Sequence, residues 1–375
     1  MSINGYATHD GTARYSERLR AGQATADNHF RLEQNLWLSS VGLGTYLGEW
    51  DEETDRRYAQ SVVRAVELGA NVIDTAANYR FQRSERAIGA ALRELLAGGV
   101  YERDEIVVCT KGGYLPFDGA PPAGQAGVRR YLEETFVQPG IAEFADIAAG
   151  SHCMTPKYLA HQIEQSRRNM GIDAIDVYYI HNPETQLGVV SRAEFERRLR
   201  EAFTQLERSV TEGKIKMYGA ATWNGFRVAP AAREYHALER MIELAREVGG
   251  DEHHFRFVQL PFNLAMPEAL ISANQPFQGA QISLLEAARA LGVTVVASAS
   301  LLQGRVAEEL PAHIREPLGS LATDALTAIQ FVRSTPGIAT ALVGMSRPAH
   351  VEENLQLARV EPASTEQYQQ LFDAP

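Results

Sequence analysis

Apolar residues follow two alternating patterns between about residue 36 and residue 358. Short, mostly apolar runs are typical of buried strands, and longer segments in which apolar residues recur at helical spacing are typical of helices with one buried face. The runs that predict strands are 41–44, 71–73, 105–109, 174–180, 215–220, 255–260, 293–297 and 339–343. Helices are predicted over 54–68, 84–96, 155–170, 195–212, 233–248, 282–291, 322–332 and 351–358.

This alternation predicts a parallel sheet whose strands are covered by helices. Eight such units favour closure into a (β/α)8 TIM barrel. An open doubly wound sheet is the alternative, but it normally carries a glycine-rich phosphate turn after its first strand. Only a fragment of that turn, Gly42-Leu43-Gly44, is present. The barrel is therefore the preferred fold.

The rest of the chain extends this barrel at its start and at two strand ends. Residues 1–28 show no periodicity and predict an N-terminal arm, extended or poorly ordered, before a single barrel domain at 29–375. The runs 30–33 and 36–38, separated by Gln34-Asn35, predict a β-hairpin. Two long loops, 113–154 with a short helix near 128–135, and 262–280, follow strand ends. We expect them to lie over the mouth of the barrel as lids.

The charge, the apolar runs and the cysteines of the chain argue against several classes of function. The 375 residues carry a formal net charge of −11 without a basic stripe, which argues against nucleic-acid binding. No apolar run is long enough for a membrane span, and the first residues do not form a secretory signal. The two cysteines, Cys109 and Cys153, provide neither a disulfide framework nor a metal-binding spacing. A reducing, cytoplasmic location is the natural expectation.

Polar residues stand at the ends of three consecutive predicted strands. Asp74 ends the second strand and Tyr79 follows it, Lys111 ends the third, and His181 ends the fourth. Each has an ordinary alternative reading, such as a helix cap for Asp74, a solvated charge for Lys111 or a turn residue for His181. In a barrel, however, these ends meet at one mouth, so the set as a whole indicates an active site.

Three segments that carry these residues resemble the catalytic segments of the aldo-keto reductase superfamily. The likeness continues through 218–223, 258–259 and 343–354, so it spans about residues 36–358 in the expected order. The three segments read Ile73-Asp74-Thr75-Ala76-Ala77-Asn78-Tyr79, Val108-Cys109-Thr110-Lys111 and Ile175-Asp176-Val177-Tyr178-Tyr179-Ile180-His181.

The resemblance implies a barrel enzyme that transfers a hydride between a nicotinamide cofactor and a carbonyl group, in either direction. Tyr79 would be the proton donor, because a hydride added to a carbonyl carbon leaves an alkoxide. Lys111 would stabilise the tyrosinate, Asp74 would hold Lys111, and His181 would orient the carbonyl oxygen. The implied cofactor contacts are Thr45, Asp74, Thr222, Gln259, Ser298, Leu301, Gln303, Gly304, Ser346, Arg347, His350, Glu353 and Asn354.

Several positions depart from the family pattern. Ala221 replaces a usual hydroxyl residue, and Ser298 stands where relatives often stack an aromatic ring on the nicotinamide. Met345 and His350 stand near positions where NADPH-preferring relatives often carry Lys and Arg, which leaves Arg347 as the fixed positive charge. NADPH (NADP) is the favoured cofactor, and NADH (NAD) is the alternative.

Substrate contacts are expected from Tyr46, Asn182 and Trp223. With Asn263, Asn274 and Gln275 on the second loop, they suggest a polar or hydroxylated carbonyl or polyol substrate. The alternative is that these amides only satisfy loop backbone.

Two other functions stay open: a cofactor-binding regulatory subunit on the same scaffold, and a lyase or isomerase barrel without nicotinamide. The sequence leaves the oligomeric state undetermined.

Overall fold

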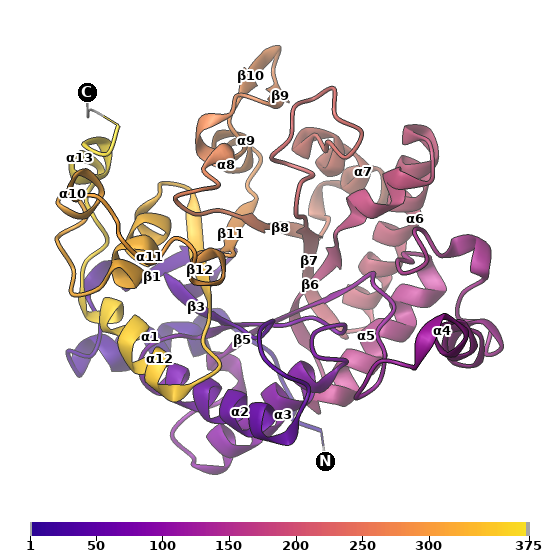
Figure 1. Ribbon diagram of the computed structural model, residues 1–375, viewed down its shortest axis with the longest axis horizontal. Coiled ribbons are helices and arrows are strands. Elements are labelled where there is room, and N and C mark those ends of the chain that lie inside the picture. Colours follow the sequence, from indigo (N-terminus) through magenta and orange to yellow (C-terminus); the bar gives the residue numbers. More distant parts are fainter. Residues whose placement is uncertain (1, 373–375) are drawn as a thin grey trace.

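The computed structural model describes residues 2–372, which form a closed parallel barrel with helices around it (Figure 1). Each strand pairs with the next in the chain, and the last pairs with the first, as Leu342 opposite Gly42 illustrates. The predicted (β/α)8 barrel is therefore confirmed. Its strands are β3 (Val41–Gly44), β4 (Val72–Asp74), β5 (Val107–Gly112), β6 (Ile175–His181), β7 (Ile215–Ala221), β8 (Phe255–Pro261), β11 (Thr294–Ser298) and β12 (Ile338–Gly344).

The helices that surround the barrel begin and end at the expected signals. Thr155 accepts the Tyr158 N–H at the start of α5, Pro156 is its first residue, and Gly171 ends it in the left-handed conformation. One helix, α7, begins later than the predicted residue 233, at Leu238, whose N–H is bound by Gln275 Oε1 at 2.9 Å. The surrounding helices are α2 (Glu52–Glu67), α3 (Arg83–Ala97), α5 (Pro156–Met170), α6 (Arg192–Thr211), α7 (Leu238–Gly249), α9 (Leu284–Ala290), α11 (Asp324–Ser334) and α12 (Pro348–Asn354).

The segment before the barrel differs from its prediction. Residues 1–28 were expected to be extended or poorly ordered, but they contain the helix α1 (His9–Ala21). Tyr15 on this helix is buried against Phe30, and Arg18 forms two hydrogen bonds with buried Glu105, at 2.9 and 2.8 Å. These tertiary contacts stabilise a helix that a weak hydrophobic pattern does not reveal.

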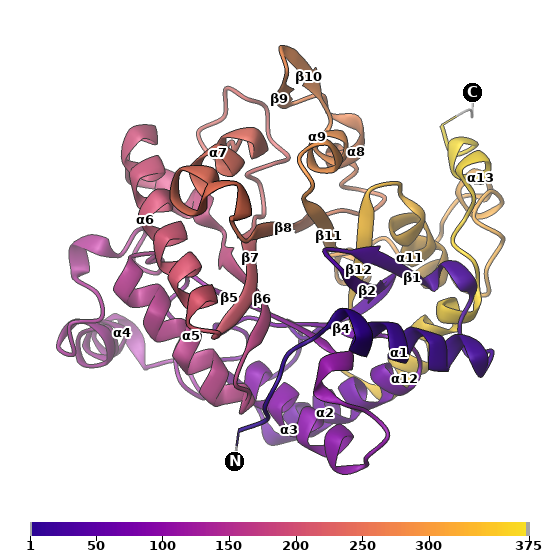
Figure 2. The ribbon, with the colours of Figure 1, turned by 180° about the vertical axis from the view of Figure 1, so that it is seen from behind.

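The predicted hairpin is confirmed as β1 (Phe30–Glu33) paired with β2 (Leu36–Ser39). Figure 2 shows this hairpin and α1 together on the face of the barrel seen from behind.

The two long loops contain more structure than predicted. Loop 113–154 carries α4 (Gly124–Leu132), close to the expected short helix, followed by one π-helical turn at Glu133–Val137. Loop 262–280 carries α8 (Glu268–Ile271) and runs into a hairpin of β9 (Gln275–Phe277) and β10 (Ala280–Ile282). Gln278 and Gly279 both have positive φ, the geometry of a two-residue hairpin turn. Two further short helices are α10 (Ala312–Arg315) and α13 (Thr365–Gln369).

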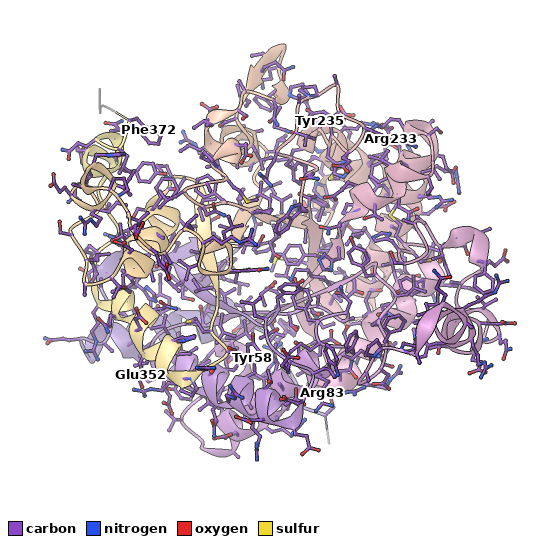
Figure 3. The ribbon with its side chains drawn as sticks, in the orientation of Figure 1. Tyr58, Arg83, Arg233, Tyr235, Glu352 and Phe372 are labelled. Atoms are coloured by element: carbon purple, nitrogen blue, oxygen red, sulfur yellow. The ribbon has the colours of Figure 1, made fainter. Side chains whose placement is uncertain are left out.

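Side chains fill the space that the ribbon leaves open (Figure 3). Alternate residues of a strand point to the same side, so an inward apolar residue fixes the direction of the residue two positions later. By this rule, the polar residues at the strand ends point into the barrel, just above the apolar side chains that fill its interior. The inward pairs are Val72 and Asp74, Cys109 and Lys111, Tyr179 and His181, and Phe257 and Gln259. Within residues 2–372, no helix has both the length and the apolar character needed to cross a membrane.

A buried carboxylate ties the N-terminal arm to the barrel. Asp176, 1% exposed, accepts the N–H groups of Ala7 and Val108 at 2.6 and 2.7 Å and pairs with Arg103 at 2.7 Å. We predict that Asp176→Ala lowers the free energy of unfolding by about 3–5 kcal/mol, because it leaves a buried guanidinium unpaired. Urea denaturation measures this change. Glu53→Ala, which removes an exposed ion pair with Arg57, should change it by less than about 1 kcal/mol. If both variants lowered the free energy of unfolding equally, Asp176 would not be the residue that ties the N-terminal arm to the barrel.

Candidate functional site

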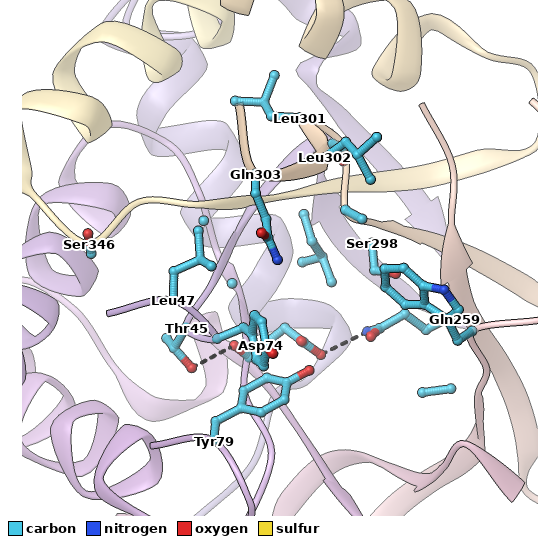
Figure 4. A pocket seen from close by; sticks show the side chains of 18 of the residues that line it. Thr45, Leu47, Asp74, Tyr79, Gln259, Ser298, Leu301, Leu302, Gln303 and Ser346 are labelled. Atoms are coloured by element: carbon cyan, nitrogen blue, oxygen red, sulfur yellow. Dashed lines mark hydrogen bonds between the residues drawn. The ribbon is translucent and has the colours of Figure 1, made fainter. Parts of the chain in front are cut away.

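A cavity of about 800 Å³ opens at the carboxyl ends of the strands (Figure 4). Its wall comes from the ends of β3, β4, β6, β7, β8, β11 and β12, from the loops after all of these except β8, and from α11 and α12, with one residue from the loop after β5. These are the positions at which a parallel barrel presents functional side chains.

An ion pair lies under the floor of this cavity. Lys111 and Asp74 are 1% and 4% exposed, and the Lys111 ammonium donates to Asp74 Oδ1 at 2.5 Å and to the Thr75 carbonyl oxygen at 2.8 Å. From the opposite side of the barrel, Gln259 Nε2 donates to Asp74 Oδ2 at 2.8 Å. Burial would lower the pKa of Lys111, but the charge and hydrogen bond of Asp74, together with nearby Tyr79, outweigh it and the pKa is raised. Lys111 is therefore a permanent positive charge inside the barrel.

Tyr79 lies above this charge. The Lys111 ammonium is 5.0 Å from the centre of its ring. Burial raises the pKa of the phenol, and the Lys111 charge opposes that rise by favouring the phenolate. The ring also makes edge contacts with Tyr46 and His181, at centroid distances of 5.0 and 5.8 Å.

His181 is the second polar ring at the cavity wall. Burial, and after it the positive charge of Lys111, lower the pKa of its imidazole well below the ordinary value. The ring is therefore neutral at physiological pH and can take part in one donated and one accepted hydrogen bond. A phenol and a neutral imidazole thus face the same space, with a cation beneath them. This arrangement can deliver a proton to an oxygen atom and stabilise the phenolate that remains.

Two buried hydroxyl groups in the cavity wall lack hydrogen-bond partners within residues 2–372. They belong to Thr222 and Ser300, which are 4% and 1% exposed. An unpaired buried hydroxyl costs about 1–3 kcal/mol, so such groups call for a polar ligand atom or water. The Thr45 hydroxyl is already engaged by the Asp74 carbonyl oxygen at 3.2 Å.

The loop after β11 is held in an unusual conformation. Ala299, Leu302 and Gln303 all have positive φ although they are not glycines. Asn263 Nδ2 donates to the Ala299 carbonyl oxygen at 2.9 Å and fixes the loop. Figure 4 shows the Gln303 side chain directed into the cavity. Strain of this kind is typical of ligand-binding loops.

The structure brings nearly all the residues proposed from the sequence to this cavity. Two do not line it: Lys111 lies beneath it, and Arg347 is exposed at the start of α12. The proposed residues that do line it are Thr45, Tyr46, Asp74, Tyr79, His181, Asn182, Thr222, Trp223, Gln259, Ser298, Leu301, Gln303, Gly304, Ser346, His350, Glu353 and Asn354. Sequence reasoning missed Leu47, Asn78, Tyr114, Ala299, Ser300, Leu302, Ala325 and Leu342. Ser300 could have been found as the second serine of the loop after β11.

The two long loops contribute little to the wall in this structure. Of 113–154 only Tyr114 lines the cavity, and 262–280 provides no lining residue. The three loop amides bind other groups: Asn263 binds Ala299, Asn274 donates to the Phe226 and Val228 carbonyl oxygens, and Gln275 binds Leu238. The three amides thus bind backbone groups, as the alternative interpretation expects, and they give no evidence about the polarity of the substrate.

The charges around the cavity are few. Its lining residues include no Lys or Arg, and Glu353 is a carboxylate at the far end, where it accepts the Thr323 hydroxyl at 3.1 Å. Within residues 2–372, no three His, Cys, Asp or Glu side chains lie together in a way that could hold a metal ion.

Comparison with known proteins finds a matching family, sequence relatives and structures of the same fold. A model of the Aldo/keto reductase family matches residues 40–374. An NADH-specific methylglyoxal reductase of Escherichia coli is 28% identical over 192 residues, which are 50% of this chain and 49% of that protein. A D-threo-aldose 1-dehydrogenase of Pseudomonas sp is 29% identical over 172 residues, 45% of each chain. The match thus spans about half the length of these curated relatives.

A crystal structure of an aldo/keto reductase from Klebsiella pneumoniae in complex with NADP and acetate has the same fold. Its TM-score is 0.60 at 20% identity, and the match covers 93% of this chain and 95% of that chain.

Replacing the buried cation tests the electrostatics of the site. We predict that Lys111→Met raises the pKa of Tyr79 further, because Lys111 acts on this phenol more strongly than Asp74, which opposes it. ¹³C NMR titration of tyrosine-labelled protein measures the change, with the signal assigned by Tyr79→Phe. The control is Lys216→Met, near the start of β7, where the ammonium lies 3.9 Å from the Tyr6 ring centre. An unchanged or lowered Tyr79 pKa in Lys111→Met would show that the two groups are not coupled.

Proposed function

The chain belongs to the aldo/keto reductase family, and on that basis we propose that it reduces an aldehyde or ketone to an alcohol with NAD(P)H, or catalyses the reverse oxidation. The observation that carries the proposal is the buried Lys111–Asp74 pair directly under Tyr79, in the floor of the cavity.

Each side chain of the site has its own role in the proton transfer. A bound dinucleotide supplies the hydride. Tyr79 donates its proton to the carbonyl oxygen, and the Lys111 charge stabilises the phenolate that is left. Neutral His181 hydrogen-bonds the same oxygen and orients the carbonyl carbon. Asp74 keeps Lys111 in place and charged, and Gln259 keeps Asp74 in place.

The remaining polar groups of the cavity fit a dinucleotide. Gln259 uses its Nε2 on Asp74, which leaves Oε1 to accept from a carboxamide, and the unpaired Thr222 hydroxyl is available for the same group. The loop 298–304 would hold the pyrophosphate, with the unpaired Ser300 hydroxyl as a donor. Ser346, Arg347, His350, Glu353 and Asn354 would hold the adenosine end. Arg347 favours NADPH, because a guanidinium suits a 2′-phosphate.

The relatives support both cofactors. The Klebsiella protein was crystallised with NADP, and the Escherichia coli reductase is NADH-specific. The absence of Lys and Arg from the cavity lining leaves Arg347 as the group that discriminates between the two.

The substrate half of the cavity fits an uncharged, hydroxylated carbonyl compound or polyol. Tyr46 and Trp223 are 58% and 45% exposed, so their rings are available to cover a ligand. The hydroxyl of Tyr114 accepts from Asn182 Nδ2 at 3.2 Å, so a phenol and an amide stand side by side next to His181. Among residues 2–372, this part of the wall has no lining Lys or Arg to form a charge-assisted bond with a substrate phosphate or carboxylate. The name of the D-threo-aldose 1-dehydrogenase relative agrees with this choice.

The first experiment is a fluorescence titration with NADPH and NADH beside a carbonyl turnover assay, on wild type and Tyr79→Phe. We predict that both nucleotides bind, NADPH more tightly, and that the variant loses about 100-fold or more of kcat with cofactor affinity unchanged, because only the proton donor is removed. Binding without turnover on a broad panel would favour a cofactor-binding regulatory subunit. No binding of either nucleotide would refute the proposal and favour a barrel lyase or isomerase.

A substrate panel tests the second half of the proposal. We predict that kcat/KM for neutral hydroxyaldehydes exceeds that for their phosphorylated counterparts by about tenfold or more, because the cavity offers no cation to offset the desolvation of a phosphate. Matched pairs with and without a phosphate, and a series of apolar aldehydes, provide the comparison. Turnover confined to apolar aldehydes, or a preference for the phosphorylated member of each pair, would overturn the assignment.

A further inference from the structure

His152 stands at the end of the long loop 113–154 and touches the main chain of His181. Its ring Nε2 is 2.7 Å from the His181 carbonyl oxygen, and its Nδ1 is 2.9 Å from Gln186 Nε2. The side chain is fully buried. His152 does not line the cavity, and it was not among the residues proposed from the sequence.

Neighbouring hydrogen bonds fix the direction of both contacts. The Arg198 guanidinium, which can only donate, donates to Gln186 Oε1 at 2.5 Å. Gln186 must therefore present its Nε2 as a donor to His152 Nδ1. His152 consequently carries its proton on Nε2 and donates it to the His181 carbonyl oxygen. Burial lowers the pKa of His152 to about 4, which keeps the ring in this neutral form.

The backbone packs closely around this contact. Gly113 has φ +141°, and a Cβ atom there would lie 2.7 Å from His152 Nε2 and 2.9 Å from the His181 carbonyl oxygen. The Leu115 N–H bonds Ser151 and the Cys153 N–H bonds Gly113, both at 2.8 Å, so the two ends of the loop meet at this point. The loop is therefore rooted on the backbone of His181.

The contact also reaches the neighbouring residues of the mouth. The Tyr114 ring lies edge-on to both histidines, with centroids 5.2 Å from His152 and 5.1 Å from His181. Asn182 is held in the left-handed conformation, φ 45°, with its N–H on the Ala221 carbonyl oxygen at 2.6 Å. The orientation of the His181 ring depends on this constrained backbone.

We propose that His152 is a positioning residue: it fixes the His181–Asn182 backbone so that the His181 ring meets the carbonyl oxygen of the substrate. Loop 113–154 would thereby influence the reaction through the contact between His152 and the His181 backbone, and not by closing over the substrate as a lid. The inference rests on the proposed reductase function.

His29 offers a matched control at a different place in the barrel. It too is fully buried, bonds a carbonyl oxygen (Gly69, 2.9 Å) through Nε2 and has a polar partner at Nδ1 (Ser40, 3.1 Å). His29 does not line the cavity and is held between the hairpin and the turn after α2. Loss of a buried histidine as such should therefore affect His152 and His29 variants alike.

The test compares His152→Leu, His152→Gln and His29→Leu by steady-state kinetics and hydrogen exchange. We expect His152→Leu to lose about tenfold or more of kcat, since small misplacements of reacting groups reduce rates steeply, with NADPH affinity within about twofold of wild type. His152→Gln, whose amide can still donate to the His181 carbonyl oxygen, should stay within about threefold of the wild-type kcat. His29→Leu should lose stability but keep kcat.

Hydrogen exchange separates this inference from the proposed function. The Asn182 amide should exchange about tenfold faster in His152→Leu and at the wild-type rate in His29→Leu, whether or not the protein turns over any carbonyl. If His152→Leu fails to fold, Gln186→Leu should show the same changes with smaller size, because it removes the Gln186 bonds to His152 Nδ1, to the His152 carbonyl oxygen and to Arg198 but leaves the Nε2 bond to His181. An unchanged Asn182 amide, an unchanged kcat, or an equal kcat loss in His29→Leu would overturn the positioning role.

Discussion

A lysine ammonium sealed inside the barrel, 2.5 Å from one carboxylate oxygen, is the interaction on which the geometry of the mouth depends. Removing both charges from water is expensive, and additional hydrogen bonds offset part of this cost. The Thr75 carbonyl oxygen accepts a second ammonium N–H, the Gln259 amide donates to the second carboxylate oxygen, and together these bonds connect β4, β5 and β8. The same charge acts on two rings above it: it favours the phenolate of Tyr79 and disfavours the imidazolium of His181. Burial is the larger influence on the pKa of each ring, and the buried cation acts on both, opposing the rise at Tyr79 and adding to the fall at His181.

The sequence predicts the barrel because each strand is buried on both faces and reads as an apolar run. It also predicts the group of polar residues at the barrel mouth, because such residues interrupt those runs at the strand ends, at Asp74, Lys111 and His181. Other features depend on partners far along the chain. The helix α1 exists through contacts of Tyr15 and Arg18 with later segments, and no local pattern encodes them. The amides of the second loop could not be assigned from sequence, since an Asn side chain serves a ligand and a backbone carbonyl equally well.

The site combines a rigid floor with a wall that contains unsatisfied groups. The floor is complete: Asp74 has a partner on each oxygen. The wall is not, because the Thr222 and Ser300 hydroxyls have no partner within residues 2–372 and the loop after β11 holds three non-glycine residues at positive φ. Both features are unfavourable for the isolated chain and become favourable when a polar ligand supplies the missing contacts. Under the proposed function, the groups that lack partners lie on the cofactor side, and the proton-transfer side is already organised before a ligand binds.

Closure of the barrel joins the first barrel strand to the last, with Val41 opposite Ala341 and Gly44 opposite Gly344. During synthesis on the ribosome, β3 emerges long before β12 exists. At a translation rate of ~5–20 residues per second, its open edge waits for about 15–60 s. The early hairpin β1–β2 and α1 cover part of the growing chain during this interval, but they cannot provide the missing ladder. The nascent chain is therefore exposed to edge-to-edge association until its final strand is released, and helper proteins that shield strand edges would act on it in this window.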